Sequence, residues 1–413
     1  MVGEELLSFL ERQGHNFKLI LLKRSGFSLF KNLTVNYVNV YIRLLGASFV
    51  QLGFIGSIGG LVNALISYPF GRLIDRYSSR KILIATLFAQ ALVPLTYFLA
   101  RDWVWIALAT AISTLAWFCS SGVENVIIAN SLRDEDRATG FASVTALSLV
   151  PSIVVPLVAG AILTQLGGLS VANINVLFLM EFAGLVLISV YVGAKLRETE
   201  SLGKDVSQSL IGELRSVLSG SPYLKRWLFI DTVSASSFVV MARYIMVYAV
   251  EEQGASPMII GAMGAAMALV GMMSSIPLGR LADRIGRIKT LILLRPLFHA
   301  STLILLFAPD PRLLVVGWAL RGVFQPSLSI LAAYRNELVD PSERGRWMGV
   351  RELLRGVFRI PSPLLGGLLY THVSPQAPFL FHMFVDVFIR IPLLLTMPGT
   401  LKATEEEDAV SPE

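Results

Sequence analysis

The sequence is poor in the residues that build soluble enzymes and disulfide-stabilised domains. Its single cysteine, Cys119, excludes an internal disulfide and any cysteine-rich metal site. Its four histidines are scattered, so we predict no metal site. No glycine-rich phosphate loop followed by lysine occurs, so ATP-driven pumping is unsupported. Charged residues make up 15% of the chain, against roughly 25% in soluble domains.

Apolar residues fill the chain instead. They make up 54% of its 413 residues and gather in long stretches such as Ile82–Ala100 and Ile174–Val192. A helix needs about 20 mostly apolar residues to cross a bilayer, so we predict an all-α membrane protein with twelve transmembrane helices. Met1–Lys23 mixes acids and bases, so we expect no cleavable signal peptide. The predicted spans lie near residues 27–45, 50–70, 82–100, 103–132, 140–165, 174–192, 227–250, 258–278, 290–308, 313–333, 347–370 and 379–397.

The basic residues are unevenly distributed around these spans. The formal net charge is +6, and nearly all lysines and arginines outside the spans fall on one side. Only Arg43, Arg101 and Arg312 stand at the opposite edges. This positive-inside pattern places both termini of a multi-pass plasma-membrane protein in the cytoplasm. The basic charge is therefore a topology signal, and we expect membrane lipids rather than nucleic acid as partners.

The two halves of the chain repeat one another. Gly46–Ser48 recurs as Gly254–Ser256, and Ser67–Arg76 recurs as Ser275–Arg284, each pair 208 residues apart. Because each half has an even number of spans, both halves enter the membrane in the same direction and form parallel repeats. We predict an N-terminal six-helix bundle at 1–194, a cytoplasmic linker with an amphipathic helix at 195–226, a C-terminal six-helix bundle at 227–398 and a cytoplasmic tail at 399–413.

Two loops carry a recognisable pattern. Gly71–Arg76 and its repeat Gly279–Arg287 resemble the signature loop of the major facilitator superfamily, glycine–x–leucine–x–aspartate–arginine–x–glycine–arginine. The first copy departs from it, with Ser78 and Ser79 where glycine and arginine are expected. The resemblance covers nearly the whole chain. It implies the major facilitator fold and a secondary transporter that works by alternating access, with no enzymatic activity and no cofactor.

The resemblance also implies an inner gate. In the family, the loop aspartate lies against the inner end of span 11 or span 5, where a helix N-terminus carries about half a positive charge. This chain has Arg344 and Arg351 at span 11 and Arg137 at span 5. With more cationic partners, Asp75 is expected to contribute more than Asp283. The expected gate residues of the loops are Gly71, Asp75, Arg76, Gly279, Asp283, Arg284, Gly286 and Arg287.

Polar residues recur at helical spacing in spans 1, 4 and 10, and less regularly in span 7. These four spans line the central cavity in the family. Polar and ionisable side chains inside a membrane are costly and usually mark function. We therefore expect them to line a substrate cavity, and the alternative is that they join helices by hydrogen bonds. The expected substrate-binding residues are Asn32, Asn36, Asn39, Trp117, Ser120, Glu124, Arg243, Tyr244, Arg321 and Gln325.

The charges within the spans differ between the halves. Arginines of spans 7, 10 and 11 lie in the second half, whereas Glu124 lies in the first. This division favours a small organic solute with an anionic or strongly polar group, either a metabolite or a drug-like export substrate. Carboxyl groups within spans often form proton relays. Glu124 is therefore our first candidate for proton coupling, and Asp231 of span 7 is the second.

An ion pair is predicted at the outer side. Arg43 and Glu251 occupy equivalent repeat positions at the outer ends of spans 1 and 7 and carry opposite charges. Pseudo-symmetry would bring them together when the outer vestibule closes. Alternatively, Arg43 extends to the lipid headgroups.

Three functions stay open. A monomeric secondary active transporter with a small solute and protons as partners is the leading one. A facilitative uniporter of the same fold is the second, and a non-transporting receptor or lipid-handling protein is the third. The sequence leaves the substrate unnamed, because a fold does not specify a function.

Overall fold

The computed structural model describes residues 8–67, 78–198, 222–339 and 344–399, and the regular elements in these ranges are all helices. This confirms the all-α prediction. Within these ranges, ten helical stretches are long and apolar enough to cross a membrane, and they match ten of the predicted spans. Predicted span 1 is interrupted by turns at residues 32–37, and predicted span 11 is interrupted near Pro361, so neither forms one long helix. The count of twelve is therefore only partly confirmed.

The contacts divide the chain into two compact units, which are described separately. Unit 1 comprises Met1–Ser48, Leu65–Asp205 and Ser256–Ala265, and unit 2 comprises Phe49–Ala64, Val206–Ala255 and Ala266–Glu413. The helices of unit 1 are α2 (His15–Lys31), α3 (Val38–Leu44), α6 (Ser79–Leu99), α7 (Trp103–Ser131), η1 (Asp134–Asp136), α8 (Arg137–Leu149), α9 (Pro151–Gln165) and α10 (Val171–Lys195). Those of unit 2 are α12 (Pro222–Ala242), α13 (Ile245–Glu251), α15 (Arg287–Leu293), α16 (Arg295–Phe307), α17 (Leu313–Val323), α18 (Ser327–Leu338), α19 (Arg344–Arg359), α20 (Ser362–His372), α21 (Ala377–Val385), η2 (Asp386–Arg390) and α22 (Ile391–Leu395).

Two helices contribute to both units. The N-terminal part of α4 (Phe49–Ser67) belongs to unit 2, and the N-terminal part of α14 (Pro257–Ile285) belongs to unit 1. Apart from these two segments, unit 1 comes from the first half of the sequence and unit 2 from the second, and the predicted domain bounds stay a prediction. The predicted linker helix and the predicted tail lie almost wholly outside the described residues.

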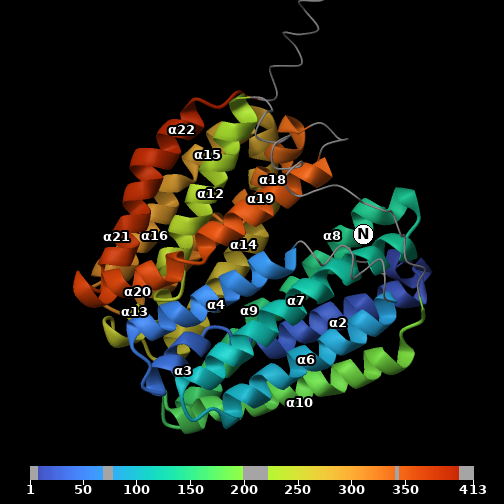
Figure 1. Ribbon diagram of the computed structural model, residues 1–413, viewed down its shortest axis with the longest axis horizontal. Coiled ribbons are helices and arrows are strands. Elements are labelled where there is room, and N and C mark those ends of the chain that lie inside the picture. Colours follow the sequence, from blue (N-terminus) through green and yellow to red (C-terminus); the bar gives the residue numbers. More distant parts are fainter. Residues whose placement is uncertain (1–7, 68–77, 199–221, 340–343, 400–413) are drawn as a thin grey trace, which may run out of the picture. The chain divides into compact units, whose positions relative to one another are not determined.

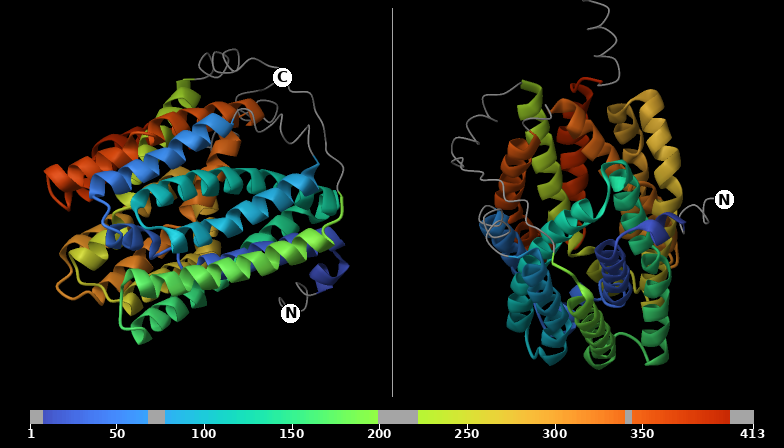
Figure 2. Two further views of the ribbon diagram at one scale, coloured as in Figure 1. Left: turned by 60° about the horizontal axis from the view of Figure 1, so that its bottom comes forward. Right: turned by 90° about the vertical axis from the view of Figure 1, so that its right-hand side faces the viewer.

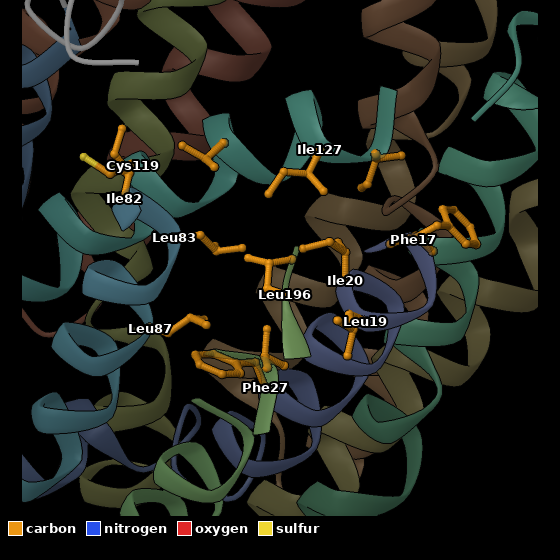
Figure 3. Packing of buried hydrophobic residues seen from close by; sticks show 14 of the residues in the cluster. Phe17, Leu19, Ile20, Phe27, Ile82, Leu83, Leu87, Cys119, Ile127 and Leu196 are labelled. Atoms are coloured by element: carbon orange, nitrogen blue, oxygen red, sulfur yellow. The ribbon is translucent and has the colours of Figure 1, made fainter. Parts of the chain in front are cut away.

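The core of unit 1 lies where α2, α6, α7 and the end of α10 meet, and these helices run side by side (Figures 1 and 2). Ile20, Leu83 and Ile127 are fully buried there, and Leu196 lies beside them (Figure 3). Lipid tails are as apolar as these side chains. Close packing, rather than exclusion from water, therefore accounts for most of the attraction between the helices.

The core of unit 2 contains large aromatic residues. Trp227 of α12 and Tyr334 of α18 pack with ring centroids 4.8 Å apart, and Trp347 of α19 is buried in the same cluster. This cluster fixes α12, α18 and α19 relative to one another. The same three helices provide part of the cavity wall described below.

The repeated glycines mark close helix contacts within each unit. A Cβ on Gly53 of α4 would collide with the backbone of Pro363 in α20. A Cβ on Gly261, the equivalent position of α14, would collide with the backbone of Pro156 in α9. Each position therefore requires a residue without a side chain, which explains why both halves of the sequence have glycine there.

Candidate substrate-binding site

A cavity of about 350 Å³ lies within unit 2, a size typical of small-molecule sites. Side chains from α12, α14, α16, α17, α18, α19, α21 and η2 line it, and most of these helices are labelled in Figure 1. Asp231 is the acidic residue of the lining. The basic residues are His382 and seven arginines, namely Arg295, Arg321, Arg335, Arg351, Arg355, Arg359 and Arg390.

Asp231 of α12 holds two of these arginines at one wall. Its Oδ2 accepts a hydrogen bond from Nε of Arg351 at 2.7 Å, and its Oδ1 accepts one from Nη2 at 3.3 Å. Nε of Arg355 lies 3.5 Å from Oδ2 of the same carboxylate. Glu352 pairs with both arginines. Two carboxylates therefore balance two guanidinium groups here.

Asp386 forms a second, more deeply buried cluster. Its Oδ1 lies 3.1 Å from Nη1 of Arg295 and 3.3 Å from Nη1 of Arg390, and its Oδ2 lies 3.0 Å from Nε2 of His299. Asp386 begins η2, which is a π-helix, an element that often occurs at functional sites. One carboxylate is shared by two arginines, so this cluster has a net positive charge.

Three lining arginines have no carboxylate within ion-pairing distance in the described part of the chain: Arg321, Arg335 and Arg359. Arg321 is the most buried of them, with 5% of its surface exposed. Its guanidinium lies 4.5 Å from the ring centroid of Phe298 and 5.0 Å from that of Trp318. These rings stabilise the cation, but Nη1 and Nη2 have no hydrogen-bond partner among the described residues. Both nitrogens are therefore unused donors.

The rest of the lining is largely apolar. It includes the aromatic rings of Trp227, Phe238, Phe298 and Phe324 and the side chains of Met267, Leu328 and Leu331. Cationic and apolar surfaces thus meet in one small space. This combination suits a ligand with a negatively charged head and an apolar body.

The structure brings together some of the predicted residues of unit 2 but not all. Arg321 and Gln325 line the cavity, as does Asp231, predicted for proton coupling. Arg351, predicted for the inner gate, lines it as well. Arg243 does not belong to this lining, and it packs against Gly56 of α4.

Tyr244 does not belong to the lining either. Its buried hydroxyl lies 2.8 Å from the carbonyl oxygen of Pro363 and 3.1 Å from that of Phe49. The hydroxyl therefore holds the start of α4 against α20. Its predicted contact with substrate stays a prediction.

The predicted asparagines belong to unit 1. Asn32 follows the end of α2 and donates to Oγ of Ser152 at 3.1 Å. Asn36 lies in the turn before α3, close to Gly264 of α14, and Asn39 is half-buried in α3. These side chains lie at the interruption of predicted span 1. Their contact with substrate stays a prediction.

The predicted site residues of α7 differ in their exposure. Trp117 is 59% exposed, whereas Ser120 and Glu124 are buried. Glu124 ion-pairs with Lys23, and its Oε2 lies 2.8 Å from Nε of Arg24. Oγ of Ser120 donates to Glu124 as well. Proton uptake by Glu124 would therefore have to compete with two cations.

The predicted gate residues are only partly described. Gly71, Asp75 and Arg76 lie outside the described residues, as does the side chain of Arg344. Gly286 has a φ of +94°, a conformation that requires glycine in this turn. Arg287 ion-pairs with Glu337 of α18 and thereby joins the loop to that helix.

The remaining gate residues are partly or fully exposed. Gly279, Asp283 and Arg284 lie near the end of α14, and Asp283 and Arg284 are exposed. Arg137, also exposed, begins α8 and donates to the carbonyl oxygen of Ala129 at 3.3 Å. The proposed contact between the loops and spans 5 and 11 stays a prediction.

The predicted outer pair stays a prediction as well. Arg43 lies near the end of α3 in unit 1 and donates to the carbonyl oxygen of Ala47. Glu251 ends α13 in unit 2 and is exposed.

Six basic residues of the lining were not among the predicted site residues: Arg295, Arg335, Arg355, Arg359, Arg390 and His382. The predicted cavity residues belong to spans 1, 4, 7 and 10, whereas these residues belong to spans 9, 11 and 12, except Arg335, which follows span 10. The missed signal was present, because Arg295 and Arg390 interrupt apolar stretches and a charge within a span usually has a function.

Comparison with known proteins agrees with this architecture. The sequence matches the Major Facilitator Superfamily over residues 25–298 and 232–410. It is 23% identical over 363 residues to the multidrug resistance protein MdtG of Dickeya zeae, which covers 84% of this chain and 86% of that one. The structure is similar to a bacterial homologue of the iron transporter ferroportin, with a TM-score of 0.72, 14% identity and coverage of 92% and 98% of the two chains. It is also similar to the human organic anion transporter MFSD10, with a TM-score of 0.61, 15% identity and coverage of 92% and 100%. By sequence and by fold, this chain belongs to the Major Facilitator Superfamily.

Proposed function

We propose that this protein is a secondary active transporter that moves a small organic anion across the membrane by alternating access. The charge imbalance of the cavity in unit 2 is the observation that carries this proposal. Seven arginines line the cavity. Within the described residues, the carboxylates that contact them are those of Asp231, Glu352 and Asp386. An excess of cations in a low-dielectric space attracts an anion.

Unpaired arginines are costly in a protein surrounded by lipid. An arginine at the centre of a spanning helix costs about 2.5–3.5 kcal/mol on insertion scales. A bound carboxylate or sulfonate would offset this cost, because its oxygens accept paired hydrogen bonds from the planar guanidinium. Arg321, with two unused donors, is the first residue we expect to contact the anion. The aromatic rings around it favour an anion with an apolar or aromatic body.

We also propose that proton coupling involves Asp231. Its carboxylate contacts Arg351 and Arg355 at the cavity wall. An anion that binds these arginines would compete with the carboxylate, which would then be able to accept a proton. Glu124 is the other candidate, but it pairs with cations of unit 1 and does not line the cavity of unit 2.

The proposed location and orientation in the membrane rest on the positive-inside pattern of the sequence. The protein would act in the plasma membrane with both termini in the cytoplasm, as a monomer among lipids. It would couple the movement of protons to the transport of one small solute.

The first test measures binding of two ligands that share a phenyl ring but differ in charge. Trp227 lines the cavity, and Trp318 lies beside Arg321, so quenching of tryptophan fluorescence reports occupancy. Benzenesulfonate should quench the purified protein saturably, and phenyltrimethylammonium should not. Arg321→Gln should weaken benzenesulfonate binding about tenfold or more, the loss expected for hydrogen bonds to a charged group. Arg312→Gln, a control at an exposed arginine, should bind as the wild type does.

The second test measures transport in proteoliposomes. Benzenesulfonate stays charged over the tested pH range and does not cross lipid by itself. An imposed pH gradient should drive its accumulation, whereas equal uptake with and without the gradient would indicate a uniporter. Asp231→Asn should abolish the gradient-driven part and retain exchange of labelled for unlabelled anion. Binding without flux would indicate a receptor, and preference for the cation would contradict the proposal.

A further inference from the structure

His382 of α21 lines the arginine-rich cavity with only 2% of its surface exposed. Its Nδ1 lies 3.1 Å from Oγ of Ser237 on α12. Its Nε2 is buried and has no hydrogen-bond partner within the described residues. A buried, unsatisfied nitrogen in the wall of a binding cavity requires a physical explanation.

The hydrogen bonds of Ser237 assign the tautomer of this imidazole. Oγ of Ser237 donates its single proton to the carbonyl oxygen of Ser234 at 3.1 Å, because a carbonyl oxygen can only accept. Both contacts of this hydroxyl are hydrogen bonds at once only when Oγ accepts from Nδ1 of His382, and we assign this tautomer, with the imidazole proton on Nδ1. In the neutral ring, Nε2 then has a free lone pair and acts as an acceptor.

The surroundings of His382 are rich in cations. The charged groups that face it are Arg295 of α16, Arg321 of α17, and Asp386 and Arg390 of η2, which directly follows α21. Asp386 is already shared by Arg295 and Arg390. A protonated imidazole would therefore stand among cations without a carboxylate of its own. The cavity thus offers unused donors on Arg321 and one unused acceptor on His382.

These two groups flank a single aromatic ring. The Arg321 guanidinium lies 4.5 Å from the ring centroid of Phe298, and the His382 ring lies 5.5 Å from it. Both groups line the cavity beside this ring, so one small ligand in the cavity is able to reach both. We infer that the site selects organic anions with a hydroxyl donor next to the charged group, such as 2-hydroxycarboxylates. This inference rests on the proposed anion transport. Arg321 binds the carboxylate, and Nε2 of His382 accepts from the hydroxyl.

The test compares mandelate with phenylacetate, which lacks only the 2-hydroxyl group. Binding is followed at neutral pH by quenching of tryptophan fluorescence in purified, detergent-solubilised protein. In the wild type, one enantiomer of mandelate should bind about five- to tenfold more tightly than phenylacetate, as one net hydrogen bond predicts. His382→Leu should remove this preference and leave phenylacetate affinity within about twofold, as expected when only the acceptor is lost. His372→Leu, a control at an exposed histidine at the end of α20, should keep the preference.

Each contrary outcome has a distinct meaning. Equal affinity of the wild type for mandelate and phenylacetate would overturn the inference but leave the anion proposal standing. A preference that persists in His382→Leu would also overturn it, because the hydroxyl would then bind elsewhere. If His382→Leu loses phenylacetate affinity as well, His382→Gln decides, since its amide oxygen is an acceptor: a retained preference supports the inference, and a lost one overturns it. Failure of the wild type to bind either acid would instead contradict the proposed function.

Discussion

At the scale of single residues, two buried glutamates of unit 1 are held in different ways. Glu124 contacts two cations, Lys23 and Arg24. Glu181 of α10 accepts a hydrogen bond from Oγ1 of Thr34 at 2.5 Å, and no cation lies within ion-pairing distance of it in the described part of the chain. Removing the charge of Glu124 therefore leaves two directly paired cations without a counter-charge, whereas Glu181 interacts with Lys31 only beyond ion-pairing distance.

This difference predicts unequal losses of stability. Glu124→Gln should lower the free energy of unfolding by about 3–5 kcal/mol, the cost of breaking a buried ion pair from one side. Glu181→Gln should change it by less than about 1 kcal/mol, because the amide oxygen still accepts from Thr34. Thermal unfolding of the two variants in the same detergent checks this. Equal melting temperatures would show that the cations of Glu124 are solvated in the native protein.

At the scale of elements, the helices depend on close approach. Gly53 of α4 and Gly261 of α14 lie against neighbouring backbone, as the internal repeat requires. Gly349 of α19 has nothing within 4 Å of the position of a Cβ. These glycines therefore separate two effects of substitution, steric collision and helix propensity.

Gly53→Ala and Gly261→Ala should each destabilise the protein by about 1–3 kcal/mol, the usual cost of overpacking. Gly349→Ala, the matched control, should be neutral or stabilising by up to about 1 kcal/mol, because alanine favours helix. Thermal unfolding again measures the effect. If all three variants melt alike, the helix contacts at Gly53 and Gly261 have room to relax.

At the scale of the whole molecule, transport requires two states that differ by only a few kcal/mol. The two signature loops are predicted to hold the inner side closed. Asp283 lies exposed near the end of α14, and Asp75 lies outside the described residues. A contact worth about 1 kcal/mol would shift such an equilibrium about fivefold.

Asp75→Asn should enrich inward-open molecules about fivefold, and Asp283→Asn should do so less, because more arginines stand at the start of span 11. Spin labels at Leu65 and Met348 in a Cys119→Ala background report the distance between the inner ends of spans 2 and 11. Asp310→Asn, a control at an exposed acid, should leave the distance distribution unchanged. An unchanged distance distribution in Asp75→Asn would show that the loop sets the orientation of the chain in the membrane but does not act as a gate.

The membrane class, the family and most of the spans follow from the sequence alone. Apolar length, the positive-inside pattern and the repeat are local or periodic properties, and each is visible without coordinates. The sequence also singled out Arg321, Gln325 and Asp231, which line the cavity, because polar groups within a span are costly wherever they lie. The interruption of span 1 was not predicted, since no proline or glycine occurs at residues 32–37.

Tertiary structure alone decided which charges share a space. Arg295 and Arg390 are 95 residues apart in the sequence, yet both contact Asp386, and Arg351 contacts Asp231 from another helix. It also decided that Tyr244 bonds to backbone carbonyls and that Nε2 of His382 is unsatisfied. A helical pattern gives the face on which a side chain lies, but not the neighbour that this face meets. That neighbour depends on packing between helices, which no local sequence property specifies.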